Sequence, residues 1–597
     1  MKEFFKMLLA VVCGLFITGF IIFFLFSSMI AALSLSGSSQ TALPKSGVLM
    51  MDMSAISIGE QESEADPIAM IQGGATRTLG LWQAVQAINA AAADPSVKYI
   101  YLKTDGLSSD YATVEEIRKS LGKFRQSGKP VISYIENPTT DGYYLSSVAD
   151  KIYMTSNPGG NPTVLGVGSQ LIFLKDILDR LGVNVQLIRH GKYKSAGEMY
   201  IRSESSKENL EQNQAMVDAI WKNLSDGITL SREISPEQLD EALNDLKLNL
   251  PQDFLELGFV DELLTTDQLR GKLADLAVVD DFKDLQFIDL ADYAAAKVIP
   301  DYKAKNKIAV IYADGEIIEG SAKSQVTGDR FAGIIAKVRK DDSIKAVVLR
   351  VNSPGGSVIA ADKIKDELDL LKAEKPLIAS YGGYAASGGY WISANCEHIF
   401  SDAGTLTGSI GVFSMIPDFS KTARNLAHVN ITTVKSHDHA DMYTLMRPLD
   451  AKEMEVQQTL VDDIYSNFVS NVSEGRGLDP DYVDSIAQGR VWTGAEALEI
   501  GLVDEIGTLE DAIHYAVALV SDSASGSLDG WRVEAYPRPV SSMESLLERF
   551  GAGSSDTDAF AGTAFEGVSA AMQSFVRDSR RGGSCILARM PYAIELN

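Results

Sequence analysis

After about residue 45 the sequence contains two similar copies of one pattern, and this duplication limits what the chain can fold into. The spacing between matching segments falls slowly, from 247 residues (341 − 94) to 243 residues (501 − 258). Four matches in the same order are hard to obtain by chance, and the period is too long for a solenoid. We therefore predict a duplicated domain. The paired segments are Asp94–Lys98 with Asp341–Lys345, Gly142–Ser146 with Gly389–Ser393, Met216–Trp221 with Leu460–Tyr465, and Leu257–Glu262 with Ile500–Glu505.

Each copy alternates short β-branched runs with helical patterns. This alternation predicts an α/β fold in which helices cover a mainly parallel sheet. In the second copy, helices are expected at Ala332–Lys340 and Ile359–Leu371. Strands are expected at Ile308–Ala313, Lys345–Val351, Leu377–Tyr381 and His398–Phe400. We place the first repeat at residues 46–304, the second at 305–537 and a C-terminal extension at 538–597.

The composition excludes several classes of protein. Lys and Arg number 54 against 80 Asp and Glu, so the net charge is −26 (54 − 80). No nucleic-acid partner is expected, because phosphate binding needs clustered basic side chains. With 45% hydrophobic and 22% charged residues, the chain is an ordinary globular protein and not a polytopic membrane protein. Three cysteines exclude a disulfide scaffold, while Cys396 and Cys585 could either pair or stay free.

The N-terminus carries an apolar run, Met7–Phe26, about as long as a bilayer span. Lysines at positions 2 and 6 precede it, and no charged residue follows before Lys45. This asymmetry predicts that the N-terminus stays in the cytoplasm and that the remainder crosses the membrane. We therefore expect a transmembrane anchor within residues 1–36. A cleaved signal peptide is the alternative, because Ala31–Ser34 offers small residues for cleavage.

A glycine-rich turn occurs in the second copy alone. The segment Leu349–Ser357 follows a predicted strand, opens a predicted helix and contains Gly355 and Gly356. Backbone N–H groups at such a junction are unpaired, and glycine lets another group approach closely. The turn could therefore hold a phosphate or stabilise the oxyanion of an acyl-transfer intermediate. The matching segment Asp105–Ser109 lacks the glycine pair, whereas a turn needed only for the fold should remain in both copies.

A candidate nucleophile, Ser387, lies among small residues in Tyr384–Tyr390 of the second copy. The matching segment of the first copy, Thr139–Tyr143, has no serine. A serine nucleophile needs a base. The chain has only six histidines and no Gly-x-Ser-x-Gly elbow. A lysine can serve instead if desolvation lowers its pKa by several units.

Lys194, within His190–Glu198 of the first copy, is the candidate base. The repeat offset carries it to residues 438–441, which contain no lysine. One copy has kept a lysine and the other a serine with its glycine loop, so we predict one site where the two domains meet. His437 and His439 stand two residues apart with no third ligand in view, which favours a polar loop over a metal site. No metal or organic cofactor is expected.

Several segments together resemble peptidase family S49, in particular its long signal peptide peptidases of the protease IV type. The resemblance covers nearly the whole chain and implies a ClpP/crotonase-like fold in each repeat. It implies a Ser/Lys dyad in which Ser387 is the nucleophile and Lys194, which follows a tyrosine and precedes Ser-Ala, is the general base. The segments are Tyr193–Ala196, Ser353–Ser357, Ala385–Trp391, Leu406–Val412 and Gly489–Gly494.

The resemblance also implies supporting groups and a setting. The backbone amides of Gly355 and Gly356 would form the oxyanion hole, and Ser409 would assist the lysine. The enzyme would be a homotetramer held by a single span in the bacterial inner membrane, with its catalytic part on the periplasmic side. Its substrates would be residual signal peptides and other apolar peptides.

Two other functions are compatible with parts of this pattern. A crotonase-type acyl-CoA enzyme would use the same glycine loop on a thioester, but would not explain the paired serine and lysine or the anchor. A catalytically inactive membrane scaffold would explain the repeats. Retention of Ser387 and Lys194, each in one copy only, argues against the scaffold.

Overall fold

The structure is a computed structural model that describes residues 14, 18, 20, 43–63, 77–320, 325–521, 526–538 and 586–590. The predicted anchor therefore lies outside the described residues, apart from three isolated positions. Most of the C-terminal extension, with Cys585, also lies outside them. No helix among the described residues is long and apolar enough to cross a membrane.

Two parallel sheets, one from each half of the chain, have the same strand order. Each strand of the first sheet has a counterpart at the same place in the second, which confirms the predicted duplication of an α/β unit. The first sheet is ordered β8 (Glu262–Leu264), β6 (Lys151–Thr155), β5 (Val131–Ile135), β4 (Val97–Lys103), β1 (Gly47–Asp52) and β9 (Phe287–Asp289). The second is ordered β20 (Glu505–Ile506), β16 (His398–Ser401), β15 (Leu377–Ala386), β13 (Ile344–Ser353), β10 (Asn306–Asp314) and β21 (Trp531–Tyr536). At one end β15 also pairs with β17 (Leu406–Gly408), which pairs with β19 (Val491–Thr493).

The helices repeat as well. The longest helix of each half, α8 and α17, has 26 residues, and their starts are 244 residues apart (451 − 207). The first half contains α3 (Leu81–Ala93), α4 (Tyr111–Arg125), α5 (Thr140–Ser146), α6 (Lys175–Arg180), α7 (Glu198–Ile201), α8 (Lys207–Arg232), α9 (Pro236–Asn244), α10 (Pro251–Glu256), α11 (Thr266–Ala277) and α12 (Leu290–Lys297). The second contains α13 (Gly328–Lys340), α14 (Val358–Lys372), α15 (Gly388–Ser393), α16 (Ser420–Asn425), α17 (Ala451–Arg476), α18 (Pro480–Ile486), α19 (Gly494–Glu499) and α20 (Leu509–Val520).

The predicted strand at Ile308–Ala313 is apolar throughout because both faces of the second sheet are covered. Ile308 and Val310 of β10 pack with α20, whereas Ala309 and Ile311 pack into the core that contains α13 and α14. Sheets buried on both faces have continuous apolar strands. All six elements expected in the second copy are present. Strands β13 and β15 continue past their predicted ends, since the first residues of the two glycine-rich segments are also in extended conformation and pair with neighbouring strands.

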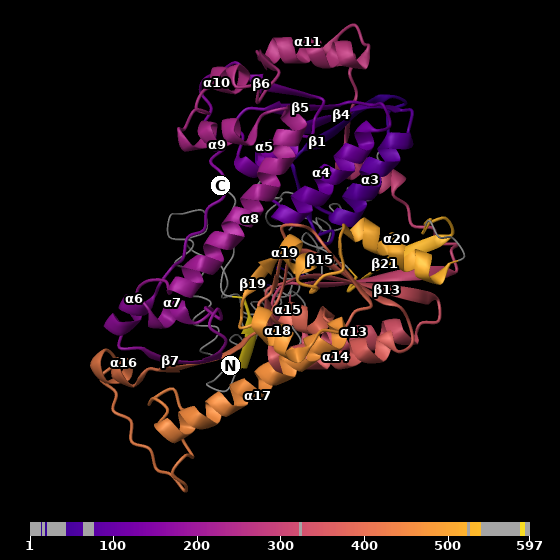
Figure 1. Ribbon diagram of the computed structural model, residues 1–597. Helices are drawn as coiled ribbons and strands as arrows, with labels where there is room; N and C mark the ends of the chain where they lie inside the picture. Colours follow the sequence, from indigo (N-terminus) through magenta and orange to yellow (C-terminus); the bar gives the residue numbers. More distant parts are fainter. Residues whose placement is uncertain are drawn as a thin grey trace, which may run out of the picture.

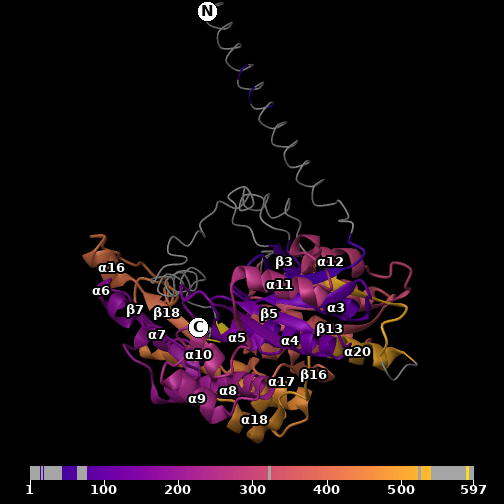
Figure 2. The same cartoon turned by 90° about the horizontal axis from the view of Figure 1, so that it is seen from above.

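A third sheet contains strands from both halves and ties them together. Its order is β12 (Val326–Thr327), β11 (Ile317–Ile318), β14 (Gly355–Ser357), β22 (Ile586–Arg589), β18 (Val412–Asp418) and β7 (Asn184–His190). Strand β7 of the first half pairs antiparallel with the whole of β18 in the second, and Figure 2 shows the two side by side. In Figure 1, α8 runs from the first sheet towards β7, so the first half reaches across the second. Two short parallel strands, β2 (Ile56–Gly59) and β3 (Arg77–Gly80), form a separate pair.

Buried charges also join the halves. The Arg350 guanidinium on β13 lies 2.8 Å from the Glu60 carboxylate and 2.7 Å from that of Glu116, both in the first half. All three side chains are almost completely buried. Burial raises the pKa of Glu60 to about 7 even though the Arg350 cation opposes the shift. Removing the cation would leave carboxylates in the interior with no opposite charge.

The Arg350→Met variant should therefore lose about 3–5 kcal/mol of unfolding free energy, the usual cost of breaking a buried ion pair. Urea titration followed by tryptophan fluorescence measures this loss. Lys222→Met is the matched control, because Lys222 pairs with Asp226 at an exposed position and such pairs contribute about 0–1 kcal/mol. Equal losses in the two variants would contradict the role given to Arg350.

Candidate active site

Three residues named from the sequence, Ser387, Lys194 and Ser409, meet in the interior. The Lys194 side-chain nitrogen, Nζ, lies 2.9 Å from Ser387 Oγ, 3.0 Å from Ser409 Oγ and 3.1 Å from the Ser409 carbonyl oxygen. Lys194 is 1% exposed, and neither serine has any exposed surface. The lysine of the first repeat is thus hydrogen-bonded directly to the serine of the second.

Strand β7 brings Lys194 to this position. Pairing of β7 with β18 ends at His190, and the chain then turns into the second half, where Tyr193 N–H donates to the Gln488 carbonyl (2.9 Å). Two glycines of the second half make room for the lysine. A Cβ atom on Gly489 would lie 2.6 Å from the Lys194 backbone nitrogen, and one on Gly411 would lie 3.2 Å from Lys194 Cδ. Both glycines belong to segments named from the sequence, but their spacing did not reveal that they face the lysine.

Ser387 lies at the junction between β15 and α15, in a backbone conformation unusual for a residue with a side chain. Its φ is 55° and its ψ is −112°. Its N–H donates to the Gly408 carbonyl and its carbonyl accepts from Trp391 N–H, each at 2.8 Å. Such backbone strain costs about 1–3 kcal/mol and is found at functional sites where the surrounding structure enforces it. The fold thus holds the serine hydroxyl towards the lysine.

The environment of Lys194 favours the neutral amine. Burial lowers its pKa well below the ordinary value of 10.5, and the positive charge of Arg589 lowers it further. Among the described residues, the hydrogen-bonding partners of Nζ are serine oxygens and include no carboxylate. Because a neutral amine has a lone pair, it can accept the proton of the Ser387 hydroxyl.

The glycine pair lies beside this constellation, in β14. Gly355 and Gly356 have φ values of 95° and 156°, and a Cβ atom on Gly356 would lie 1.9 Å from the Ile317 carbonyl oxygen. Gly355 N–H donates to Ser353 Oγ (3.2 Å). A Cβ atom on Gly388, the residue after Ser387, would lie 3.1 Å from the Gly356 nitrogen. The glycine loop and the serine turn therefore touch, and Gly388 is a neighbour that the sequence reasoning missed.

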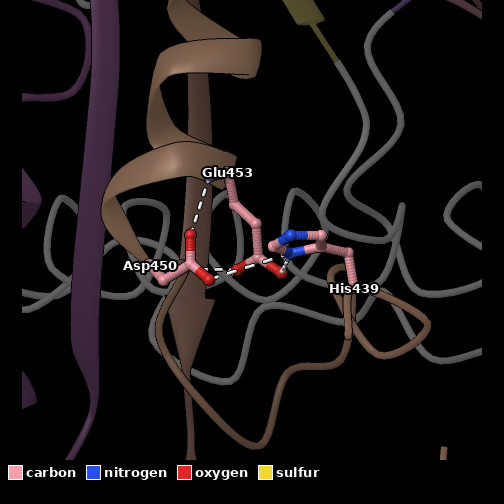
Figure 3. Close-up of side chains that lie close together, drawn as sticks. All are labelled: His439, Asp450 and Glu453. Atoms are coloured by element: carbon pink, nitrogen blue, oxygen red, sulfur yellow. Dashed lines mark hydrogen bonds and ion pairs between the residues drawn. The ribbon is translucent and has the colours of Figure 1, made fainter. Parts of the chain in front are cut away.

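His439 lies apart from these residues, in a cluster with Asp450 and Glu453 (Figure 3). Its Nδ1 atom lies 2.9 Å from a Glu453 oxygen and 3.7 Å from an Asp450 oxygen. The Arg447 guanidinium contacts both Glu453 oxygens at 2.7 Å and lowers the pKa of that carboxyl to about 2. Asp450 and Glu453 also form the capping box of α17. These contacts explain the cluster as an ion-pair network that caps a helix. A metal ion would have to compete with the Arg447 guanidinium for the Glu453 oxygens.

Two histidines and one cysteine that could be reactive make contacts that belong to the fold. His398 in β16 stacks on Tyr515, and His514 in α20 hydrogen-bonds to the Gly526 carbonyl at 2.8 Å. The position of His398 in a strand agrees with the sequence expectation. The Cys396 thiol is free and buried, and burial raises its pKa to about 12. In the described part of the chain, none of these groups hydrogen-bonds to Ser387 or Lys194.

A serine hydroxyl bonded to a buried lysine, beside a glycine loop on a parallel α/β sheet, is the arrangement of a serine hydrolase. The profile of peptidase family S49 matches residues 123–280 and 369–521, and the Clp protease profile matches residues 302–400. The chain therefore belongs to peptidase family S49, and it is a serine peptidase.

Named relatives agree with this assignment. Protease 4 of Haemophilus influenzae is 33% identical over 546 residues, covering 88% of each chain. Protease 4 of Salmonella typhi is 32% identical over 535 residues, covering 86% of this chain and 83% of the relative. The chloroplastic serine protease SPPA of Arabidopsis thaliana is 30% identical over 446 residues, covering 73% of this chain and 65% of the relative.

The buried amine should make stability depend on pH in a specific direction. The unfolded chain binds a proton at Lys194 below about pH 10.4, whereas the folded chain binds it only below a much lower pKa. The parent should therefore lose stability, relative to Lys194→Met, as the pH falls from 10 towards 7. Thermal unfolding midpoints across this range measure the difference. The exposed Lys192, replaced in the same way, should show no such trend, and parallel curves for parent and Lys194→Met would exclude a depressed pKa.

Proposed function

We propose that this peptidase is a membrane-anchored endopeptidase with a Ser387/Lys194 dyad that degrades cleaved signal peptides and other apolar peptides. The observation that carries the dyad is the buried contact of 2.9 Å between Lys194 Nζ and Ser387 Oγ. The depressed pKa of Lys194 supports its role as the base, because a lysine of ordinary pKa would be protonated near neutral pH.

In this mechanism neutral Lys194 takes the Ser387 proton while Oγ attacks the peptide carbonyl carbon. The resulting tetrahedral intermediate collapses as the C–N bond breaks, and the ammonium of Lys194 returns the proton to the leaving amine. A water molecule then gives a proton to Lys194 and attacks the acyl-serine carbonyl. Departure of Ser387 Oγ, which takes the proton back, releases the acid and restores the enzyme.

The oxyanion of the intermediate needs hydrogen-bond donors close to Ser387. Gly356 N–H is our first candidate, and Gly388 N–H, which adjoins it, is the second. Gly355 was predicted alongside Gly356, but its N–H would have to release Ser353 Oγ to take part. A single oxyanion donor typically contributes about 3–4 kcal/mol to transition-state stabilisation.

Ser409 supports the base in this proposal. Its hydroxyl and carbonyl oxygens both contact Lys194 Nζ, so they limit the positions that the amine can take. Ser409 itself has a φ of 50°, and its N–H donates to the Arg490 carbonyl at 2.7 Å. It therefore acts as a positioning residue.

The setting of the enzyme is proposed from the N-terminal sequence and the family. The apolar run Met7–Phe26, flanked by lysines on one side only, would anchor the catalytic part on the periplasmic side of the bacterial inner membrane. An anchor would keep the site close to the bilayer, where residual signal peptides remain. Assembly as a homotetramer is proposed from the family resemblance.

The dyad is tested by hydrolysis of apolar peptides by Ser387→Ala and Lys194→Met. Loss of the nucleophile should lower kcat/KM by at least about 10³-fold, and loss of the base by about 10²–10⁴-fold. The matched control is Lys192→Met, two residues from the base and exposed, which should retain parent activity. Full activity of a folded Lys194→Met enzyme would place the base elsewhere. If the parent itself is inert on peptides yet binds coenzyme A, the acyl-CoA reading takes precedence.

Ser409→Ala tests the positioning role. Loss of one hydrogen bond to a buried group costs about 1–3 kcal/mol, so kcat should fall by about 5–150-fold while KM changes little. The acid limb of the pH–rate profile should also shift, since the environment of Lys194 changes. A fall in kcat with an unmoved pH profile would indicate a purely structural effect.

A further inference from the structure

The backbone carbonyl of Lys194 is held by an ion pair that the proposed mechanism does not use. The Arg189 guanidinium donates to the Lys194 carbonyl oxygen at 2.8 Å. The same guanidinium nitrogen, Nη1, lies 3.1 Å from a carboxylate oxygen of Glu198. Arg189 belongs to β7 and Glu198 is the first residue of α7, so the pair closes the turn between these two elements. The arginine thus connects the backbone of the proposed base to a carboxylate.

Glu198 is itself fixed by the start of helix α8. Its side chain is 1% exposed, and a carboxylate in the interior is costly unless it is paired and hydrogen-bonded. Its second oxygen accepts from the Ser206 N–H at 3.3 Å and from the Asn209 side-chain amide at 3.4 Å. Ser206 is the N-cap of α8, and negative charge is favourable near a helix N-terminus. The 26-residue helix therefore sets the position of the carboxylate and, through it, of Arg189.

The same helix contacts the second half of the chain beside Ser409. The buried Gln212 side chain of α8 accepts from Val491 N–H at 2.8 Å. The residue before Val491 is Arg490, whose carbonyl accepts from Ser409 N–H at 2.7 Å. One helix thus fixes the carboxylate on the lysine side of the site and a neighbour of the segment that holds Ser409 on the other side.

The position of the Lys194 backbone decides whether its amine stays in the interior. A lysine side chain is a flexible four-carbon stem that ends in a strongly hydrated ammonium group. Burial is the main cause of the lowered pKa of Lys194, so a backbone shift that lets water reach the amine would raise that pKa again. Lys194 N–H donates to the Gly191 carbonyl at 3.2 Å, whereas its carbonyl accepts from Arg189. The second contact comes from a side chain, so one substitution removes it and leaves the backbone hydrogen bonds in place.

We propose that Arg189 and Glu198 are positioning residues of this peptidase, whose ion pair holds the Lys194 carbonyl so that the amine stays buried between Ser387 and Ser409. Without the pair, the amine gains access to water, holds its proton more strongly and takes the Ser387 proton more slowly. This inference deepens the proposed function and rests on it, because positioning matters only if Lys194 is the base.

The positioning role is tested by peptide hydrolysis with Arg189→Met and Glu198→Gln in the full chain. In both variants kcat should fall by about 10–100-fold while KM changes little, because a misplaced group can cost about 10²-fold. The acid limb of the pH–rate profile should move to higher pH in both. A direct effect of charge would move the two limbs in opposite directions, since one variant loses a cation and the other an anion.

Two further variants control this experiment. Arg189→Lys keeps a cationic donor and should recover part of the lost kcat. Arg125→Met is the matched control, because Arg125 pairs with Asp150 at the surface of the same half and should leave both kcat and the pH profile as in the parent. Glu198→Gln keeps the shape of the side chain and carries the test if Arg189→Met does not fold.

The position of the amine is tested without catalysis by thermal unfolding. The parent should lose stability relative to Lys194→Met as the pH falls from 10 towards 7. When both chains also carry Arg189→Met, this loss should shrink to about half or less, because an amine in contact with water has a pKa nearer the ordinary value. When both carry Arg125→Met instead, the full loss should remain.

The two measurements separate this inference from the proposed function. If the parent is inert on peptides but the stability difference shrinks with Arg189→Met, the peptidase mechanism fails and the ion pair still holds the amine. If the parent is active and folded Arg189→Met and Glu198→Gln keep its kcat, or lose kcat with an unmoved pH profile, the pair supports only the fold and the inference is wrong. Parallel stability curves for parent and Lys194→Met would overturn both the base and its positioning.

Discussion

The arrangement of this peptidase centres on one lysine amine that is held against a serine hydroxyl in the protein interior, with no ionic partner among the described residues. The amine comes from the first repeat and the hydroxyl from the second, so the site exists only while the two halves stay docked. A buried lysine costs stability, and here that cost has a chemical consequence, because desolvation is what lowers the pKa of Lys194. The docking of the two halves therefore both forms the site and lowers the pKa of the amine.

Backbone pairing and buried ion pairs hold the two halves together. Seven residues of β7 pair with β18, which places Lys194 four residues beyond a well-anchored strand and leaves little freedom in its position. Away from the site, Arg350 joins Glu60 and Glu116 across the same interface. A buried ion pair contributes modest net stability but penalises any arrangement that separates its members, which suits an interface that must keep one register.

Much of the architecture follows from sequence pattern. The duplication was visible because α8 and α17, β6 and β16, and β8 and β20 keep nearly the same spacing. The continuous apolar runs predicted sheets that are covered on both faces. Ser387 and Lys194 could be named because each occurs in one copy only. Gly388, Gly411 and Gly489 could not be given roles in this way, since a glycine that makes room for a neighbour leaves no mark of which neighbour it is. The tail strand β22 was missed because its partners, β14 and β18, are more than 160 residues away in the chain (586 − 418 = 168).

By itself the sequence determined the α/β class, the repeat, the candidate nucleophile and the candidate base, because local periodicity and the comparison of two copies are properties of the chain order. Only the tertiary structure decided that Lys194 reaches Ser387, that Ser409 holds the amine and that Gly355 N–H already has a partner. Likewise, only the folded chain shows the C-terminal strand β22 paired with β14, next to the serine turn. Except for the contact between Gly355 and Ser353, these join segments about 190 or more residues apart. Their distances depend on how the two sheets pack, which no local pattern encodes.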